Sequence, residues 1–367
     1  MADELRIKQG SLVAAALAGA WRSETPALSF SEEELELVAP LLNVSGAGAL
    51  AWWKFRHTPL VDCEAARGFR QSYRLQTLRA AAREAELGSL FALLEASGVE
   101  AVLVKGWAAG RAYAEQGLRP PGDIDLYVRP GREHQRALEV LSSPEGGNFW
   151  VDLHEGCGDL GGDLEEFYGR ARVFEVCGAR VRVPCEEDHL RLLCFHLLRH
   201  GAWRPLWLCD VAAALESRAE RFDWRRFLGK SRRETNWVLS TLGLARRLLG
   251  ACVEGTPAAG AAGSLPRWLA HAVLARWASP YATEQSPHKH RAPMRKYLRR
   301  PRGLVRDLRN RWPGPVEATV AARGRFDALP RWPYQLAHSF ARAARFLAGT
   351  SDAPLSLTRQ EVRAEDV

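Results

Sequence analysis

The sequence lacks the motifs and the long apolar runs that define several common protein classes. It contains no G-x-x-x-x-G-K-[ST], G-x-S-x-G or G-x-G-x-x-G motif, which argues against P-loop, α/β-hydrolase and dinucleotide-binding proteins. The apolar stretch from Leu12 to Trp21 is too short to span a membrane, and the acidic start with Asp3 and Glu4 lacks the basic lead of a secretory signal. We therefore expect a soluble protein with no transmembrane segment.

Cysteine pairs and internal repeats are also missing. The seven cysteines form no C-x-x-C pair, and their odd number predicts reduced thiols in a cytoplasmic protein rather than a disulfide framework. With 367 residues, of which 47% are apolar and 26% charged, the chain is long enough for two or three folded domains.

Lysine is scarce, and the basic residues are unevenly distributed. Only six of the 51 basic residues are lysines. A GC-rich genome favours arginine over lysine, which would explain this ratio without a functional reason. The net charge is +8, yet the window from Lys289 to Arg311 holds ten Lys or Arg and one acid, Asp307. This window fits a nucleic-acid backbone, an anionic membrane surface or the phosphates of a lipid-linked sugar, and equally a solvated face.

The spacing of apolar residues changes twice along the chain. It is helical up to Ser97-Gly98, alternates between strand and helix over residues 99–185, and is helical again afterwards. This order predicts an α+β fold, with a small sheet and flanking helices between N-terminal and C-terminal helical regions. The predicted regions are 1–98 (helical), 99–185 (sheet-containing core), 186–255 (helices that close the cleft), 256–264 (linker), 265–349 (helical, with the basic segment 289–311) and 350–367 (mobile tail).

The predicted elements are short strands and helices that follow one another along the chain. The strands are expected at 100–105, 123–128, 148–154, 173–176 and 180–183, the last two as a hairpin around Cys177-Gly178-Ala179. Helices are expected at 107–116, 131–141, 186–200, 206–217, 224–228, 238–249, 265–277 and 334–348.

Two carboxylates stand one residue apart in an otherwise apolar strand. Because alternate residues of a strand face the same side, Asp123 and Asp125 point together while Ile124 and Leu126 point toward a core. Like charges crowded in this way are unfavourable without a cation, and paired carboxylates suit Mg²⁺ that also holds substrate phosphates. Asp152 is a third carboxylate in a strand, and His154 shares its face as a hydrogen-bonded wall residue.

Three segments carry a resemblance to a known family: Leu103-Val104-Lys105-Gly106, Arg119-Pro120-Pro121-Gly122-Asp123-Ile124-Asp125-Leu126 and Val151-Asp152-Leu153-His154. Together they resemble the DNA polymerase beta type nucleotidyltransferase superfamily, and in particular its bacterial branch of mostly uncharacterised members with a Leu-x-Lys-Gly and Arg-x-x-Gly-Asp-Ile-Asp-Leu signature. The resemblance covers about residues 69–217 and implies a small mixed nucleotidyltransferase-type sheet.

The resemblance also implies roles for individual residues. Asp123, Asp125 and Asp152 take the catalytic and metal positions, where they would hold two Mg²⁺ ions. Gly106 takes the phosphate turn, and Lys105 or Arg119 would neutralise phosphate charge beside it. Trp107 departs from the wider pattern, which has a serine after the glycine. A later run, His-x-x-x-His followed by Trp-x-x-Asp, places His196, His200 and Asp210 at the cleft as contacts for nucleotide or acceptor.

The histidines also allow a second interpretation. His189, His196 and His200 fall on one helix face, so that with Asp210 they could form a metal site. We favour the role in the cleft.

The predicted activity is Mg²⁺-dependent transfer of a nucleoside monophosphate from a nucleoside triphosphate, such as ATP, to an acceptor hydroxyl or phosphate. The acceptor is expected to be a small molecule or a saccharide. An RNA acceptor such as tRNA, bound through Lys289 to Arg311, is the first alternative. A binding protein that keeps the nucleotidyltransferase fold without turnover is the second, because the serine after Gly106 is absent.

Overall fold

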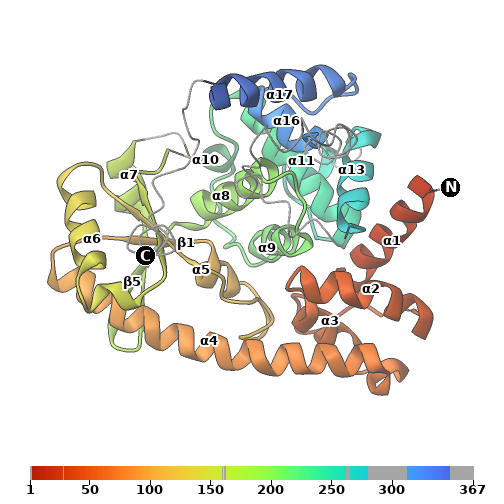
Figure 1. The fold of residues 1–367 in the computed structure, drawn as a ribbon, viewed down its shortest axis with the longest axis horizontal. Helices are drawn as coiled ribbons and strands as arrows, with labels where there is room; N and C mark the ends of the chain where they lie inside the picture. The colour runs from red at the N-terminus through yellow and green to blue at the C-terminus, as the bar shows by residue number, and fades with distance from the viewer. Residues whose placement is uncertain are drawn as a thin grey trace, which may run out of the picture.

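A computed structural model describes residues 2–27, 29–158, 160, 163–261, 265–279 and 312–347. Within these ranges the chain forms a five-stranded mixed sheet with helices before, around and after it (Figure 1). The predicted α+β fold is confirmed. The basic segment 289–311 and the predicted tail 350–367 lie outside the described residues.

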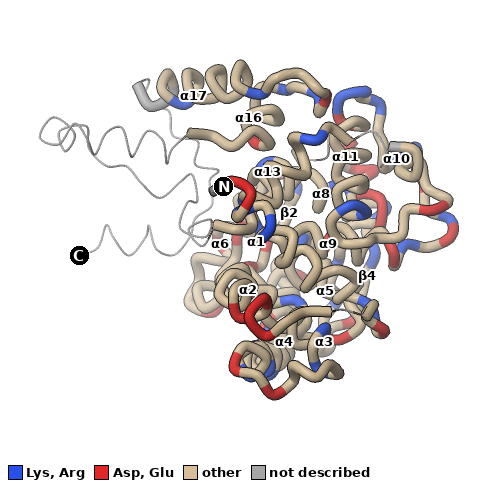
Figure 2. The backbone as a smooth tube through the Cα atoms, turned by 90° about the vertical axis from the view of Figure 1, so that its right-hand side faces the viewer, with Lys and Arg blue, Asp and Glu red and all other residues tan. Residues whose placement is uncertain are grey.

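The part before the sheet is helical. Its elements are α1 (Ala2–Leu17), α2 (Glu32–Val44), α3 (Gly48–Phe55), the 3-10 turn η1 (Pro59–Asp62) and the 33-residue α4 (Glu64–Ala96). Ser31 and Glu34 form a capping box at the start of α2, where acidic side chains gather as the helix dipole favours (Figure 2). Helix α4 runs along one side of the molecule beneath both the sheet and the other helices (Figure 1), and it ends at Ser97-Gly98, as predicted.

The sheet has the strand order β3-β2-β1-β5-β4. Strands β2 and β3 are parallel, as are β1 and β5, whereas β1 pairs antiparallel with β2 and β4 with β5. The β4–β5 hairpin turns at Cys177 and Gly178, both with positive φ, as two-residue hairpin loops favour. The strands are β1 (Val102–Val104), β2 (Ile124–Val128), β3 (Val151–Glu155), β4 (Arg172–Val176) and β5 (Ala179–Val183).

The two faces of the sheet pack on different helices because side chains alternate along each strand. Leu103, Ile124 and Leu126 pack on the C-terminal half of α4 and on α6 (Arg132–Ser142). On the opposite face, Val104 and Tyr127 belong to a separate cluster with residues of α7 (Leu164–Arg170) and α8 (Glu186–Arg199). Asp125, which alternates with Ile124 and Leu126, therefore lies on the face that α7 and α8 cover.

The helices after the sheet share one hydrophobic core with α1, α2 and α3. Gly10 of α1 allows a close crossing, since a Cβ there would lie 2.1 Å from the carbonyl oxygen of Leu274. No described helix combines the length and hydrophobicity that a membrane crossing requires. The remaining elements are α5 (Gly106–Gly110), the 3-10 turn η2 (Gly146–Asn148), α9 (Pro205–Glu216), α10 (Trp224–Leu228), α11 (Arg232–Leu249), α12 (Ala258–Ala261), α13 (Arg267–Trp277), α16 (Pro315–Ala321) and α17 (Trp332–Leu347).

Several elements differ from the predicted bounds, and β3 begins at Val151, three residues later than predicted. Helix α5 ends at Gly110 instead of continuing to residue 116, because the chain then turns to place Tyr113 and Leu118 in the helical core. Helix α11 begins six residues earlier than predicted, at Arg232, where the Ser231 side chain accepts a hydrogen bond from the backbone N–H of Glu234. The segment predicted as a linker contains the short helix α12, whose Ala258 is fully buried.

Candidate active site

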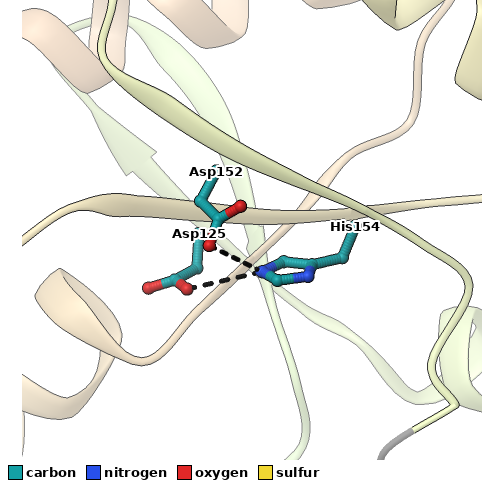
Figure 3. A group of neighbouring side chains, drawn as sticks. All are labelled: Asp125, Asp152 and His154. Atoms are coloured by element: carbon teal, nitrogen blue, oxygen red, sulfur yellow. Dashed lines mark ion pairs between the residues drawn. The ribbon is translucent and has the colours of Figure 1, made fainter. Parts of the chain in front are cut away.

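Two acidic side chains meet across the parallel strands β2 and β3. Asp125 and Asp152 are direct partners in the strand register, so both carboxylates lie on the face covered by α7 and α8. His154 follows on the same face of β3, and its Nε2 lies 3.2 Å from Asp152 Oδ2 and 3.6 Å from Asp125 Oδ1 (Figure 3). One ligand atom from each of these three residues lies within 4.8 Å of the others, a spacing that suits a metal ion.

The charges in this group are strongly coupled. Burial opposes the positive charge of His154, but the carboxylates of Asp125 and Asp152 raise its pKa to about 9. Burial also opposes ionisation of Asp125, yet His154 and Lys105 hold its pKa below the ordinary value. The imidazolium thus supplies positive charge that two adjacent carboxylates require.

The donor set fits a divalent cation. Asp152 Oδ1 is buried and accepts no hydrogen bond from the described residues, which leaves one acceptor for a cation or water. Carboxylate oxygens suit Mg²⁺ or Mn²⁺, whereas an imidazole nitrogen suits transition metals, and His154 would have to release its proton to bind one. Among the described residues, Asp125, Asp152 and His154 form the group of three that could hold a metal ion. The histidines of α8 are not part of it.

Asp123 lies at the edge of this group rather than inside it. Asp123 directly precedes Ile124, the first residue of β2, and it is exposed. Desolvation and the negative charges of Asp125 and Asp152 raise the pKa of Asp123, so the three carboxylates are near neighbours. The structure therefore brings Asp125 and Asp152 together as the sequence predicts, adds His154, and leaves Asp123 beside them.

The Lys105-Gly106 turn closes one side of the acidic group. Lys105 Nζ lies 2.7 Å from Asp125 Oδ1. Gly106 has a positive φ of 27°, and a Cβ there would lie 3.0 Å from the carbonyl oxygens of Pro121 and Asp123. Glycine is therefore needed for the turn to approach the loop before β2 so closely. Its contact with phosphate stays a prediction.

Two arginines that the sequence did not single out lie near Asp123. The charges of Arg83 and Arg204 both oppose the rise in the pKa of Asp123. Arg83, on α4, donates to the carbonyl oxygen of Gly122 at 2.9 Å, and Arg204, just before α9, donates to that of Ser45 at 2.7 Å. The sequence gives one indication for Arg204, because it lies between His200 and Asp210, which are both predicted to contact the nucleotide or the acceptor. Arg83 lies in an ordinary helical pattern that gives no such indication.

Arg119 and Asp210, both predicted to bind nucleotide, bind each other. Arg119 Nε lies 2.9 Å from Asp210 Oδ1 and Nη2 lies 3.1 Å from Oδ2, while the Tyr113 hydroxyl donates to Oδ1 at 2.7 Å. The side chains of Arg119 and Asp210 are 8% and 0% exposed. Because Arg119 Nη1 also donates to the carbonyl oxygen of Pro120, this ion pair ties the loop before β2 to helix α9.

His196 and His200 form an aromatic group with Trp207. The His196 ring centroid lies 4.5 Å from those of both His200 and Trp207. Burial and the positive charges of Lys105 and His200 lower the pKa of His196 well below its ordinary value, so it is a neutral imidazole. The influence of Lys105 places this group toward the acidic site, on the side of α8 and α9.

His189 leads to a prediction about stability. Its Nε2 is buried without a hydrogen-bond partner among the described residues, and burial lowers its pKa to about 4. The unfolded chain protonates this histidine near pH 6.5, so the folded state loses stability as the pH falls from about 6.5 to about 4. Between pH 7 and pH 5 we expect the free energy of unfolding to fall by about 2 kcal/mol more in the wild type than in His189→Gln. Urea denaturation of both proteins measures this, and equal decreases would contradict it.

A mixed sheet with paired carboxylates on neighbouring strands, next to a glycine turn, fits the nucleotidyltransferase class. The family model described as uncharacterised nucleotidyltransferase matches residues 31–144 and 143–250. These ranges cover more than half of the chain and contain the whole acidic group, so the protein belongs to this family. No curated protein and no solved structure matches the chain.

Proposed function

We propose that the protein transfers a nucleoside monophosphate from a nucleoside triphosphate to an acceptor hydroxyl or phosphate and releases pyrophosphate, with Mg²⁺ as the cofactor. The observation that carries the proposal is the register of β2 and β3, which sets Asp125 opposite Asp152. Membership of a nucleotidyltransferase family supports the class of reaction. The expected acceptor is a small molecule or a saccharide.

The carboxylates and Lys105 have separate roles in this proposal. Asp125 and Asp152 hold the cofactor, with Asp123 beside them for a second ion. Mg²⁺, when bound, would supply positive charge to the phosphate groups and would lower the pKa of the acceptor hydroxyl. Lys105 balances the charge of Asp125, and Asp152 accepts the proton of the acceptor.

The cations around Asp123 would orient the triphosphate. Arg83 precedes Asp123 in the sequence and Arg204 follows it, yet the charges of both act on Asp123, so both guanidinium groups lie near this carboxylate. Guanidinium groups bind phosphate oxygens through charged hydrogen bonds. The neutral His196 and the adjacent Trp207, whose rings meet edge to face, provide aromatic contacts for a nucleobase or an acceptor ring.

The direct test is an incubation of the protein with labelled ATP, GTP, CTP and UTP, Mg²⁺ and a cell extract. We expect a species that gains the mass of a nucleotide, together with pyrophosphate in equal amount, and loss of both when EDTA removes the metal. Mass spectrometry detects the product. Transfer that continues in EDTA would contradict the metal-dependent mechanism.

An RNA acceptor is the second candidate because Lys289 to Arg311 contains ten basic residues and one acid. If RNA is bound through this segment, counterion release predicts that binding weakens by orders of magnitude between about 50 and 200 mM salt. Filter binding of a tRNA pool at several salt concentrations measures this. A flat dependence would favour the small acceptor.

A further inference from the structure

A cavity of about 270 Å³ lies between α4, α5 and the segment that leads to Pro121. Gly106 and Pro121 form one wall, and Glu84, Trp107, Arg111 and Gln116 form much of the rest. It borders α4, whereas the acidic group lies on the sheet face covered by α7 and α8. Asp125, Asp152 and His154 do not line it, so it is distinct from the acidic group.

The polar groups of the cavity are held in place by contacts within the protein. Glu84 Oε1 accepts hydrogen bonds from Trp107 Nε1 at 3.0 Å and from Gln116 Nε2 at 2.7 Å. The Arg111 guanidinium carbon lies 5.0 Å from the centroid of the Trp107 ring and 3.8 Å from that of Phe174. Within the described part of the chain, Arg111 forms ring contacts but no ion pair. Arg119, which also lines the cavity, is paired with Asp210, whereas Glu84 and Arg111 do not neutralise each other by direct contact.

The carboxylate and the guanidinium together favour a neutral ligand. An anion would be attracted by Arg111 but repelled by Glu84, and a cation the reverse, so neither gains enough to offset the loss of its hydration; a hydroxyl group can donate to Glu84 and accept from Arg111. Trp107 gives a ring on which an apolar ring face can pack. The volume is slightly below the range typical of drug-sized ligands, which limits the occupant to about one ring.

We propose that this cavity binds a neutral, hydroxyl-rich, single-ring molecule, such as a monosaccharide or a cyclitol. Binding needs neither nucleoside triphosphate nor metal, so it is measured apart from the proposed nucleotidyl transfer. Because Gly106 packs against Pro121, an occupant touches both sides of the contact that positions the Lys105-Gly106 turn.

The test is saturation-transfer NMR and titration calorimetry on the full chain without nucleotide or metal. The neutral probes are glucose, galactose, N-acetylglucosamine and myo-inositol, and the charged probes are glucose 6-phosphate and glucosamine. We expect at least one neutral probe to bind, and both charged probes to bind at least about tenfold more weakly. Binding of charged probes alone, or of none of the six, would overturn the proposal.

Three variants connect binding to the cavity. Glu84→Gln and Arg111→Gln should each weaken binding of the neutral probe at least about tenfold, because each removes one charged hydrogen bond. Arg79→Gln is the matched control, since Arg79 is an exposed residue of α4 outside the cavity. Circular dichroism establishes that each variant is folded. Unchanged affinity in folded Glu84→Gln and Arg111→Gln would assign the probe to another surface and overturn the proposal.

Discussion

Asp125→Asn is expected to lower the rate of nucleotidyl transfer at least about 10²-fold, because it removes charge from the centre of the proposed cofactor site. Asp125 is the residue that both Lys105 and His154 approach, and it faces Asp152 across the strands. Pyrophosphate release under saturating Mg²⁺ measures the effect. Asp62→Asn, at an exposed acid in η1, is the matched control and should leave the rate unchanged.

Asp125→Asn should also lower the free energy of unfolding, and this effect distinguishes Asp125 from Asp123. Without the Asp125 carboxylate, Lys105 and His154 lose the charged acceptor that they share, at a cost of about 1.5–3 kcal/mol. Asp123 is exposed and outside the group of three, so Asp123→Asn should reduce transfer while leaving the free energy of unfolding nearly unchanged. Full activity in Asp125→Asn would reject the mechanism, and full activity in Asp123→Asn would reject only its role at a second ion.

Asp210→Ala should be the most destabilising single change at the site. It leaves the guanidinium of Arg119 buried without its two carboxylate contacts, and breaking a buried ion pair in this way costs about 3–5 kcal/mol. The pair is 8% and 0% exposed, whereas Arg246 and Glu254 form an exposed pair with 42% and 66% exposure. Glu254→Gln is therefore the control, with a much smaller expected loss, because solvent screens an exposed ion pair. Urea denaturation measures both.

A double substitution shows whether Asp210 acts through Arg119. If the cost comes from an unpaired charge, Arg119→Met combined with Asp210→Leu should recover much of the stability lost in Asp210→Ala. Transfer should stay low in both proteins, because the loop from Pro120 to Asp123 loses its tie to α9. An unchanged free energy of unfolding in Asp210→Ala, with a raised KM for the nucleotide, would instead support the direct nucleotide contact that the sequence predicts.

The sequence by itself was sufficient for the local features of the fold. Alternation in the segment from Asp123 to Val128 and in that from Asn148 to His154 indicates two strands, and it places Asp152 and His154 on one face. Residues 97 and 98 indicate the end of a helix, and the turn at residues 177–179 indicates a hairpin. These predictions succeed because each depends on neighbours within a few residues.

The tertiary structure decided which residues meet. The register of β2 against β3 sets Asp125 opposite Asp152 and brings His154 into their group, which no periodicity could specify. Arg119 and Asp210 are 91 residues apart in sequence, and only the packing of the loop before β2 against α9 pairs them. Arg83 and the cavity beside Gly106 depend on the path of α4 past α5. Periodicity reports which way a side chain faces along its own element, but the packing of distant elements determines what it faces.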